Sequence, residues 1–312
     1  MTGIINMFIG RFMGGGGGGG GAGRAVFFAG DGYNVIDYVT LETTGNAVDF
    51  GDSLNITNPQ GSGVASTTRG VAAGQYGQNY IEYVTIASAG NATDFGDLFV
   101  NGRGLGGCNN STRGVFMGIN SGDTSTSNTI QYITIASTGN ASDFGDLLYN
   151  TSDPGLVAGG ISSSTRGVCA GGYDTDYSYK IQYITTASTG NSSNFGDLIT
   201  AVTEAKSTSS DTRGLTAGGY TTGFAQQNTI NYITIASTGS ASDFGDLYRG
   251  SPYVNNMGAA SNKTRAVFAG GSNSNNVIQY VTVATTGNSL DFGDLTVGRP
   301  GISAFCDNNG GV

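Results

Sequence analysis

The feature that most constrains the fold of this chain is a motif that recurs six times along it. Each copy contains an arginine followed by Gly or Ala and an apolar residue, and later a close variant of the string TIASTGNASDFGDL. A period of about 45 to 50 residues indicates one supersecondary unit per repeat, packed on its neighbours. The units begin at Arg24, Arg69, Arg113, Arg166, Arg213 and Arg265.

Each unit contains four short stretches with the character of β-strands. In the third unit, RGVFMG ends in glycine, NTIQYITIAS alternates apolar and polar residues from Ile130 to Ile135, and SDFGDL follows the turn TGN. The remaining strand is the Gly-rich stretch before the arginine, for example residues 102–110. Short strands separated by Gly, Asn and Ser turns are typical of all-β folds. Four strands in each of six units predict a six-bladed β-propeller over residues 24–312.

The two ends of the repeat region are complementary. The chain enters the repeats at RAVFFAG, a second strand without a first, and leaves them through GRPGISAFCDNNGG, a first strand without a second. Pairing residues 301–309 with residues 24–30 would complete the first blade from both ends. Because closure removes exposed sheet edges, we expect this pairing to close the ring.

The order of motifs resembles the kelch repeat, in which a Gly pair ends the second strand and a Tyr lies in the third. The Gly pairs are AGGY at 170–173 and 217–220 and FAGG at 268–271. The chain has no Trp to match the kelch anchor, and a repeated Phe takes that place. The resemblance implies the propeller fold and no particular activity. The matching residues are Tyr38, Tyr83, Tyr132, Tyr183, Tyr232 and Tyr280, followed by Phe50, Phe95, Phe144, Phe195, Phe244 and Phe292.

The repeated DFGD string predicts structural contacts. We expect its Phe to fill the space between neighbouring blades and its Gly to permit a close turn. Its last Asp recurs as regularly as the repeat Arg, which predicts Arg–Asp pairing. A cation-binding ring of carboxylates is the alternative, but calcium sites gather several oxygen ligands within one loop, so no metal is expected. The aspartates are Asp52, Asp97, Asp146, Asp197, Asp246 and Asp294.

Composition excludes several classes of function. The net charge of −9 with 13 basic residues argues against nucleic acid as a partner. His is absent, which removes His-activated nucleophiles and His-bound metals, so we expect neither an enzyme nor a cofactor. Cys108, Cys169 and Cys306 are far apart in the sequence and are expected to be small buried side chains. No apolar run is long enough to span a bilayer.

The two sets of loops differ in constancy. The loops before the arginine and between the third and fourth strands repeat closely, whereas the other two sets vary in length and carry aromatic residues. Because strands alternate in direction, each pair of sets lies at one end of the propeller, giving a constant face and a variable face. The variable face is predicted to bind a saccharide or a protein, with unconstrained drift of the loops as the alternative. Its candidates are Tyr76, Tyr173, Tyr177, Tyr179, Tyr220, Phe224, Tyr248 and Tyr253.

Residues 1–23 precede the repeats. They lack the basic start and the cleavage site of a signal peptide. Eight glycines, Gly14 to Gly21, follow an apolar stretch, and they form either a flexible tether or a closely packed segment. We expect a docking peptide for a larger assembly that leaves the propeller on the constant face, with a frayed terminus as the alternative. Its anchoring residues are Ile4, Ile5, Met7, Phe8, Ile9, Phe12 and Met13.

The string IASTGNASDFGDL is similar to repeats in structural and tail-fibre-like proteins of marine bacteriophages, especially those of cyanobacteria. This resemblance implies a non-enzymatic protein on the virion exterior, either a fibre or adhesin or a capsid decoration. Residues 1–23 would bind other virion proteins, and the variable face would bind a host-surface glycan or protein. A purely architectural cap without a ligand is the alternative. A glycan-processing propeller is disfavoured because the chain lacks the Trp-containing turns of sialidases.

Overall fold

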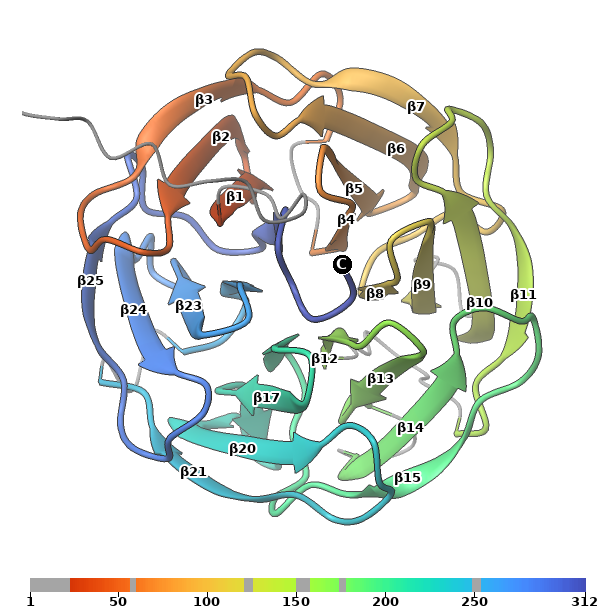
Figure 1. The fold of residues 1–312 in the computed structure, drawn as a ribbon, viewed down its shortest axis with the longest axis vertical. Coiled ribbons are helices and arrows are strands. Elements are labelled where there is room, and N and C mark those ends of the chain that lie inside the picture. Colours follow the sequence, from red (N-terminus) through yellow and green to blue (C-terminus); the bar gives the residue numbers. More distant parts are fainter. Residues whose placement is uncertain (1–22, 57–59, 121–125, 150–157, 174–177, 249–253) are drawn as a thin grey trace, which may run out of the picture.

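The protein is a closed ring of six four-stranded antiparallel sheets, as predicted (Figure 1). The computed structural model describes residues 23–56, 60–120, 126–149, 158–173, 178–248 and 254–312. Each sheet is one blade, with its first strand at the central axis and its fourth strand at the rim. The predicted N-terminal anchor lies outside the described residues.

The first two strands of each blade form the inner half of the ring. The second strands begin at the repeat arginines. The first strands are β26 (Ser303–Cys306), β4 (Ser62–Ala65), β8 (Gly106–Asn109), β12 (Ala158–Ser162), β16 (Lys206–Ser209) and β22 (Gly258–Ser261). The second strands are β1 (Arg24–Gly30), β5 (Arg69–Gln75), β9 (Arg113–Asn120), β13 (Arg166–Ala170), β17 (Arg213–Ala217) and β23 (Arg265–Ala269).

The other two strands form the outer half, and a short hairpin of β18 (Tyr220–Thr221) and β19 (Ala225–Gln226) extends the fifth blade. The third strands are β2 (Tyr33–Thr40), β6 (Gln78–Thr85), β10 (Thr126–Thr134), β14 (Lys180–Thr185), β20 (Thr229–Thr234) and β24 (Val277–Thr282). The fourth strands are β3 (Val48–Asp52), β7 (Thr93–Asp97), β11 (Ser142–Asp146), β15 (Ser193–Asp197), β21 (Ser242–Asp246) and β25 (Leu290–Asp294).

The predicted closure of the ring is confirmed. Strand β26 pairs with β1 in antiparallel register, with Ala25 opposite Cys306 and Phe28 opposite Ser303. The Asp307 carboxylate accepts the backbone N–H of Arg24 at 2.9 Å. In the other blades, an Asn or Ser just after the first strand accepts the N–H of the repeat Arg in the same way, for example Asn110 with Arg113 at 2.7 Å. The two ends of the chain therefore rebuild the turn that a continuous blade would contain.

A buried arginine strengthens this closure, and nothing in the repeat pattern pointed to it. The Arg299 side chain is fully buried and forms an ion pair with the equally buried Asp37 at 2.7 Å. Its remaining N–H groups donate to backbone carbonyl oxygens, including those of Ala29 at 2.8 Å and Phe27 at 3.2 Å. Because every N–H of the guanidinium has a partner, the buried charge is fully compensated. This cluster joins the chain before β26 to the second and third strands of the first blade.

The strings TGN and DFGD repeat because they bind each other across every blade boundary. Gly190 N donates to Phe144 O at 2.7 Å, and the Asn191 side chain accepts the N–H of Asp146 at 3.0 Å. A Cβ on Gly145 would lie 2.6 Å from the Gly190 backbone, so only glycine fits there. The expected close turn at this glycine is wrong, because Gly145 lies within β11 beside a β-bulge. The glycine permits close approach of two blades.

The predicted Arg–Asp pairing is also wrong. None of the six repeat arginines forms an ion pair with a repeat Asp, although all twelve residues lie in the described part of the chain. Arg69 instead stacks over the Tyr83 ring at 4.4 Å and donates to Ile135 O, in the next blade, at 3.0 Å. All six arginines follow this pattern, from Arg24 with Ile86 O to Arg265 with Leu41 O. The arginine donates a hydrogen bond to a carbonyl oxygen of the next blade, which an acceptor such as a carboxylate could not do.

The repeated phenylalanines lie between the blades, as predicted. Each is only 2–3% exposed. Phe50, for example, packs among residues of the first and second blades such as Ile36 and Val84. Each ring also meets the repeat Tyr of its own blade edge to face, as Phe144 does with Tyr132 at 5.9 Å. The cysteines are buried, also as predicted, and no helix among the described residues is long and apolar enough to cross a membrane.

Candidate functional site

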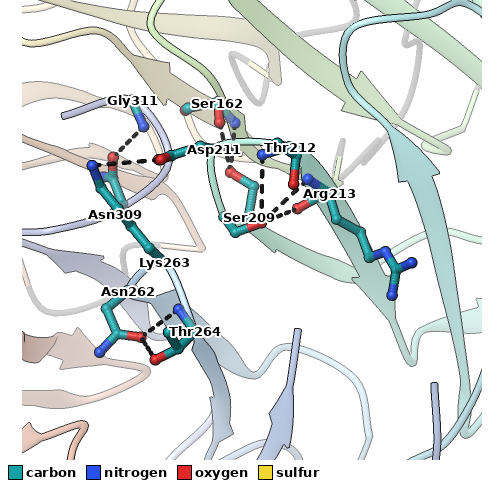
Figure 2. Close-up of polar contacts among 11 residues, drawn as sticks. Ser162, Ser209, Asp211, Thr212, Arg213, Asn262, Lys263, Thr264, Asn309 and Gly311 are labelled. Atoms are coloured by element: carbon teal, nitrogen blue, oxygen red, sulfur yellow. Dashed lines mark hydrogen bonds and ion pairs between the residues drawn. The ribbon is translucent and has the colours of Figure 1, made fainter. Parts of the chain in front are cut away.

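The loops of the constant face use their polar groups within the propeller itself. Figure 2 shows one sector, where the Asn262 side chain accepts the backbone and hydroxyl hydrogens of Thr264 at 2.9 and 3.0 Å. The first strands are joined by a similar series, since Ser162 N donates to Ser209 Oγ at 2.8 Å and Ser209 N to Ser261 Oγ at 3.1 Å. The first kind of contact shapes a turn, and the second joins neighbouring blades.

The chain that follows β26 covers the axis on this face. Asn309 and Asn109 exchange side-chain hydrogen bonds at 3.1 and 3.3 Å. Asn309 Oδ1 also accepts Gly311 N at 2.8 Å, as Figure 2 shows. Gly310 N donates to Ser209 O at 3.2 Å, and a Cβ on Gly310 would lie 2.2 Å from Ser210 O. The constant-face end of the axis is therefore filled by the protein's own backbone.

The predicted binding residues of the variable face have different surroundings. Tyr76, Tyr179, Phe224 and Tyr248 are exposed, with Phe224 the most exposed at 77%. Tyr173 and Tyr220 are half-buried, and Phe224 packs edge to face on Tyr220 at 6.1 Å. Tyr177 and Tyr253 lie outside the described residues. The structure thus gives several separate aromatic side chains around the variable face and does not gather them in one pocket.

Of a ring of exposed apolar side chains at the outer edge of the variable face, sequence analysis named only Tyr248. These side chains occupy one repeat position, two residues after the last Asp of DFGD, and we call them the rim residues. Each backbone N–H donates to a polar side chain of the following blade, as when the Gln131 side-chain oxygen accepts Phe99 N at 2.7 Å. The rim residues are Leu54, Phe99, Leu148, Ile199 and Tyr248, each 52–62% exposed.

The second missed site lies where the axis opens on the variable face. The loops from each fourth strand to the next first strand run from the rim to the axis, so their last residues meet there. Gly104 N donates to Gln60 O at 2.8 Å, Gly301 N to Asn256 O at 2.7 Å, and Asn256 N to Glu204 O at 3.3 Å. We call Tyr76, Arg103, Glu204, Lys206, Asn255 and Asn256 the axial mouth.

Charged groups of the axial mouth are partly desolvated. Glu204 Oε2 accepts from the amides of Asn255 at 2.9 Å and Asn256 at 2.7 Å. Burial raises the pKa of Glu204, while those amides and the nearby charges of Lys206 and Arg103 oppose the increase. Burial also lowers the pKa of Lys206 to about 8, against the opposing charge of Glu204. Burial outweighs pairing at both groups, which is unusual outside functional sites.

Several polar atoms of the axial mouth lack partners among the described residues. They are Arg103 Nε, Asn255 Oδ1 and Asn256 Oδ1. The Arg103 guanidinium stacks over the Tyr76 ring at 4.6 Å. Lys206 Nζ reaches one acceptor within the described chain, Gly61 O across the axis at 3.3 Å. Below it, the axis holds a cavity of about 30 Å³, enough for a water molecule.

The possible metal ligands and the thiols among the described residues are characterised by their grouping and their burial. No three His, Cys, Asp or Glu side chains gather as a metal site in this part of the chain. Burial raises the pKa of Cys169 to about 12 and that of Cys108 still further, so both thiols stay protonated. A buried neutral thiol is a poor nucleophile and a poor ligand.

The fold and the site together define a six-bladed β-propeller with one internally bonded loop face and one face that carries exposed aromatic and partly desolvated polar groups. No protein-family model matches the chain, and no curated protein sequence matches it.

Proposed function

We propose that the protein is a non-enzymatic component of the exterior of a bacteriophage particle, where its variable face binds the host surface. The resemblance of its repeats to those of marine phage structural proteins supports the particle. The contrast between the two faces supports binding, and it is the observation that carries the proposal. Constant-face polar groups are bonded between blades, whereas the variable face carries Tyr76 and Phe224 in exposed positions.

Residues 1–23 would attach the protein to other virion proteins. Strand β1 begins on the constant face, where Gly23 O accepts Leu41 N at 2.9 Å, so the described chain starts at the end opposite the variable face. Attachment there would point the variable face outward. The net charge of −9 disfavours nucleic acid as a partner.

Binding to cells tests the proposal directly. Purified protein is added to cultured marine cyanobacteria, and retained protein is compared for the native chain and the double variant Tyr76→Ser, Phe224→Ser. Leu290→Thr is the control, because Leu290 is 59% exposed on an outer strand and other blades carry Thr or Ser at that position. We expect the double variant to lose binding and the control to keep it. Unimpaired binding by the double variant would instead favour an architectural cap.

The architectural cap is the second candidate because the rim residues support it. A ring of exposed Leu, Phe, Ile and Tyr side chains is the kind of surface that a protein partner covers. Under this alternative, Phe99→Ser with Leu148→Ser would stop incorporation into the particle, while the host-binding proposal predicts normal incorporation. Removal of residues 1–21 should abolish incorporation if they are the anchor.

A further inference from the structure

The axial mouth combines unpaired donors and acceptors in a confined space, and its ligand class follows from that combination. We propose that it binds a saccharide through adjacent hydroxyl groups, with Arg103, Glu204, Lys206, Asn255 and Asn256 as hydrogen-bonding partners. The inference rests on the proposed function, because it names the ligand and the place of binding on the variable face.

The two asparagines are the main evidence that the mouth is built for a ligand. Asn255 and Asn256 are only 2% and 9% exposed, and both point their amide nitrogens at Glu204. Their side-chain oxygens, Oδ1, then remain without partners among the described residues. A buried acceptor without a partner is destabilising, so such groups are kept where something else pairs with them.

The backbone at the mouth is also strained. Gln60, Glu204 and Asn256 have positive φ angles of 29°, 57° and 55°. Non-glycine residues rarely adopt this conformation, and those that do cluster at ligand sites. Three such residues come from three different blades and meet at one end of the axis. Hydrogen bonds between the loop ends, such as Gly301 N to Asn256 O and Asn256 N to Glu204 O, hold these conformations without a ligand.

The mixture of charges selects a hydroxyl group over an ion. Arg103 and Lys206 would repel a metal cation, and the Glu204 carboxylate would repel an acidic ligand. A hydroxyl group donates one hydrogen bond and accepts others, so it suits neighbouring donors and acceptors at once. Saccharides carry such groups on adjacent carbon atoms. No amino-acid side chain carries hydroxyl groups on adjacent carbon atoms, so this combination favours a saccharide over a protein ligand.

Tyr76 adds the apolar part of a saccharide site. Its ring is 51% exposed, and the Arg103 guanidinium lies over it at 4.6 Å. A Tyr ring provides a rigid surface for the C–H face of a sugar at low entropic cost. The stacking also fixes the guanidinium, whose Nε then points toward a buried position without a partner.

Saturation-transfer NMR on the full chain tests this assignment. The probes are methyl α-D-mannopyranoside, methyl β-D-galactopyranoside and methyl β-D-glucopyranoside, each at millimolar concentration. We expect at least one to bind the native protein, and its dissociation constant to rise about tenfold in Arg103→Met and in Asn256→Gly. Glycine suits the positive φ of Asn256, so that variant keeps the backbone. Leu148→Ser, at the rim, should bind like the native protein.

Three results would overturn the inference. One is binding by none of the three glycosides. Another is unchanged binding in both mouth variants when thermal melting shows them folded. The third is binding of sodium sulfate that strengthens in Glu204→Gln, which would identify an anion site instead. The two proposals can fail separately. If the double variant Tyr76→Ser, Phe224→Ser loses cell binding but the native protein binds no glycoside, this inference is rejected and the proposed function stands.

Discussion

The loops at the two ends of the propeller differ in what their side chains contact. On the constant face, the Asn and Ser side chains accept backbone N–H groups of their own turn or of the preceding blade, as Asn110 and Asn191 do. On the variable face, the axial mouth keeps polar atoms unpaired and the rim keeps apolar side chains exposed.

This difference separates stability from recognition within one repeat. A constant-face loop that changed would break a contact between blades, so its sequence is restricted in every copy. A variable-face loop must only join the ends of two strands, so its length and chemistry are free to differ. The predictions below test this separation, beginning with the contacts that should matter most.

Loss of the closing strand should have the largest effect. Deletion of residues 300–312 removes β26 and Asp307, which leaves the edge of β1 unpaired. We expect aggregation or a large fall in melting temperature, measured by scanning calorimetry. Removal of Val312 alone is the control and should change little. A melting temperature unaffected by the longer deletion would mean that the ring does not depend on closure.

Truncation of a repeat Phe should destabilise the protein nearly as much as loss of the closing strand. Phe144 is 2% exposed, so Phe144→Ala should lower the free energy of unfolding by about 3–5 kcal/mol. Phe99→Ala, at the 59% exposed rim, should change it by less than about 0.5 kcal/mol. Denaturant titration measures both. If the two variants lost similar amounts of unfolding free energy, the contacts between blades would matter no more for stability than the variable face does.

A methyl group added at a blade boundary should have an intermediate effect. A Cβ on Gly196 would lie 2.3 Å from Gly239 O, whereas a Cβ on Gly239 would meet open space. Gly196→Ala should therefore cost about 1–3 kcal/mol, and Gly239→Ala less than about 0.5 kcal/mol. The two glycines belong to the same contact, so equal effects in denaturant titration would show that close approach is not the reason for the repeated glycine.

The buried lysine of the axial mouth should make the free energy of unfolding depend on pH. The pKa of Lys206 is lowered from 10.5 to about 8, so between those values the unfolded state binds more protons. The free energy of unfolding should then rise with pH in this window, by at most about 1.4 kcal/mol per pH unit. Lys206→Met should lack this contribution. Denaturant titration at several pH values gives the free energy of unfolding of both proteins. If the difference between them does not change from pH 8 to 10.5, the pKa of Lys206 is not lowered in the folded state.

The smallest effect should come from the exposed aromatic loops. Phe224 is 77% exposed and contacts Tyr220 only edge to face, so Phe224→Ala should change stability by less than about 0.5 kcal/mol. The same titration measures it. A cost above about 1 kcal/mol would mean that this loop is part of the packed structure.

Residues with a regular period were predictable, and residues that act across the ring were not. The repeated Phe, the Gly-rich strands and the complementary ends followed from spacing alone. The Arg–Asp pairing failed because equal recurrence shows that two positions share a role in every blade without showing that they meet. Arg299 and Asp37 have no counterpart in the repeat, and only their fully buried ion pair identifies them.

The candidate site was predictable only in part. Exposed Tyr76 and Phe224 followed from loop composition, because variable loops with aromatic residues lie on the surface. The rim residues other than Tyr248 were overlooked because an apolar residue after a strand looks like part of the core. Arg103, Glu204 and Asn256 were overlooked because they are far apart in the chain and occupy loops of different length.

The sequence by itself determined the number of blades, their strand order and the closure of the ring, because these depend on local patterns that recur. Only the tertiary structure decided which groups meet at the axis, because six loop ends converge there through the geometry of the ring. It also decided that the repeat arginine bonds a carbonyl oxygen of the next blade, since the angle between blades brings Ile135 O to Arg69. Which residues form hydrogen bonds across a boundary between two blades depends on that angle, and the sequence of one repeat does not specify it.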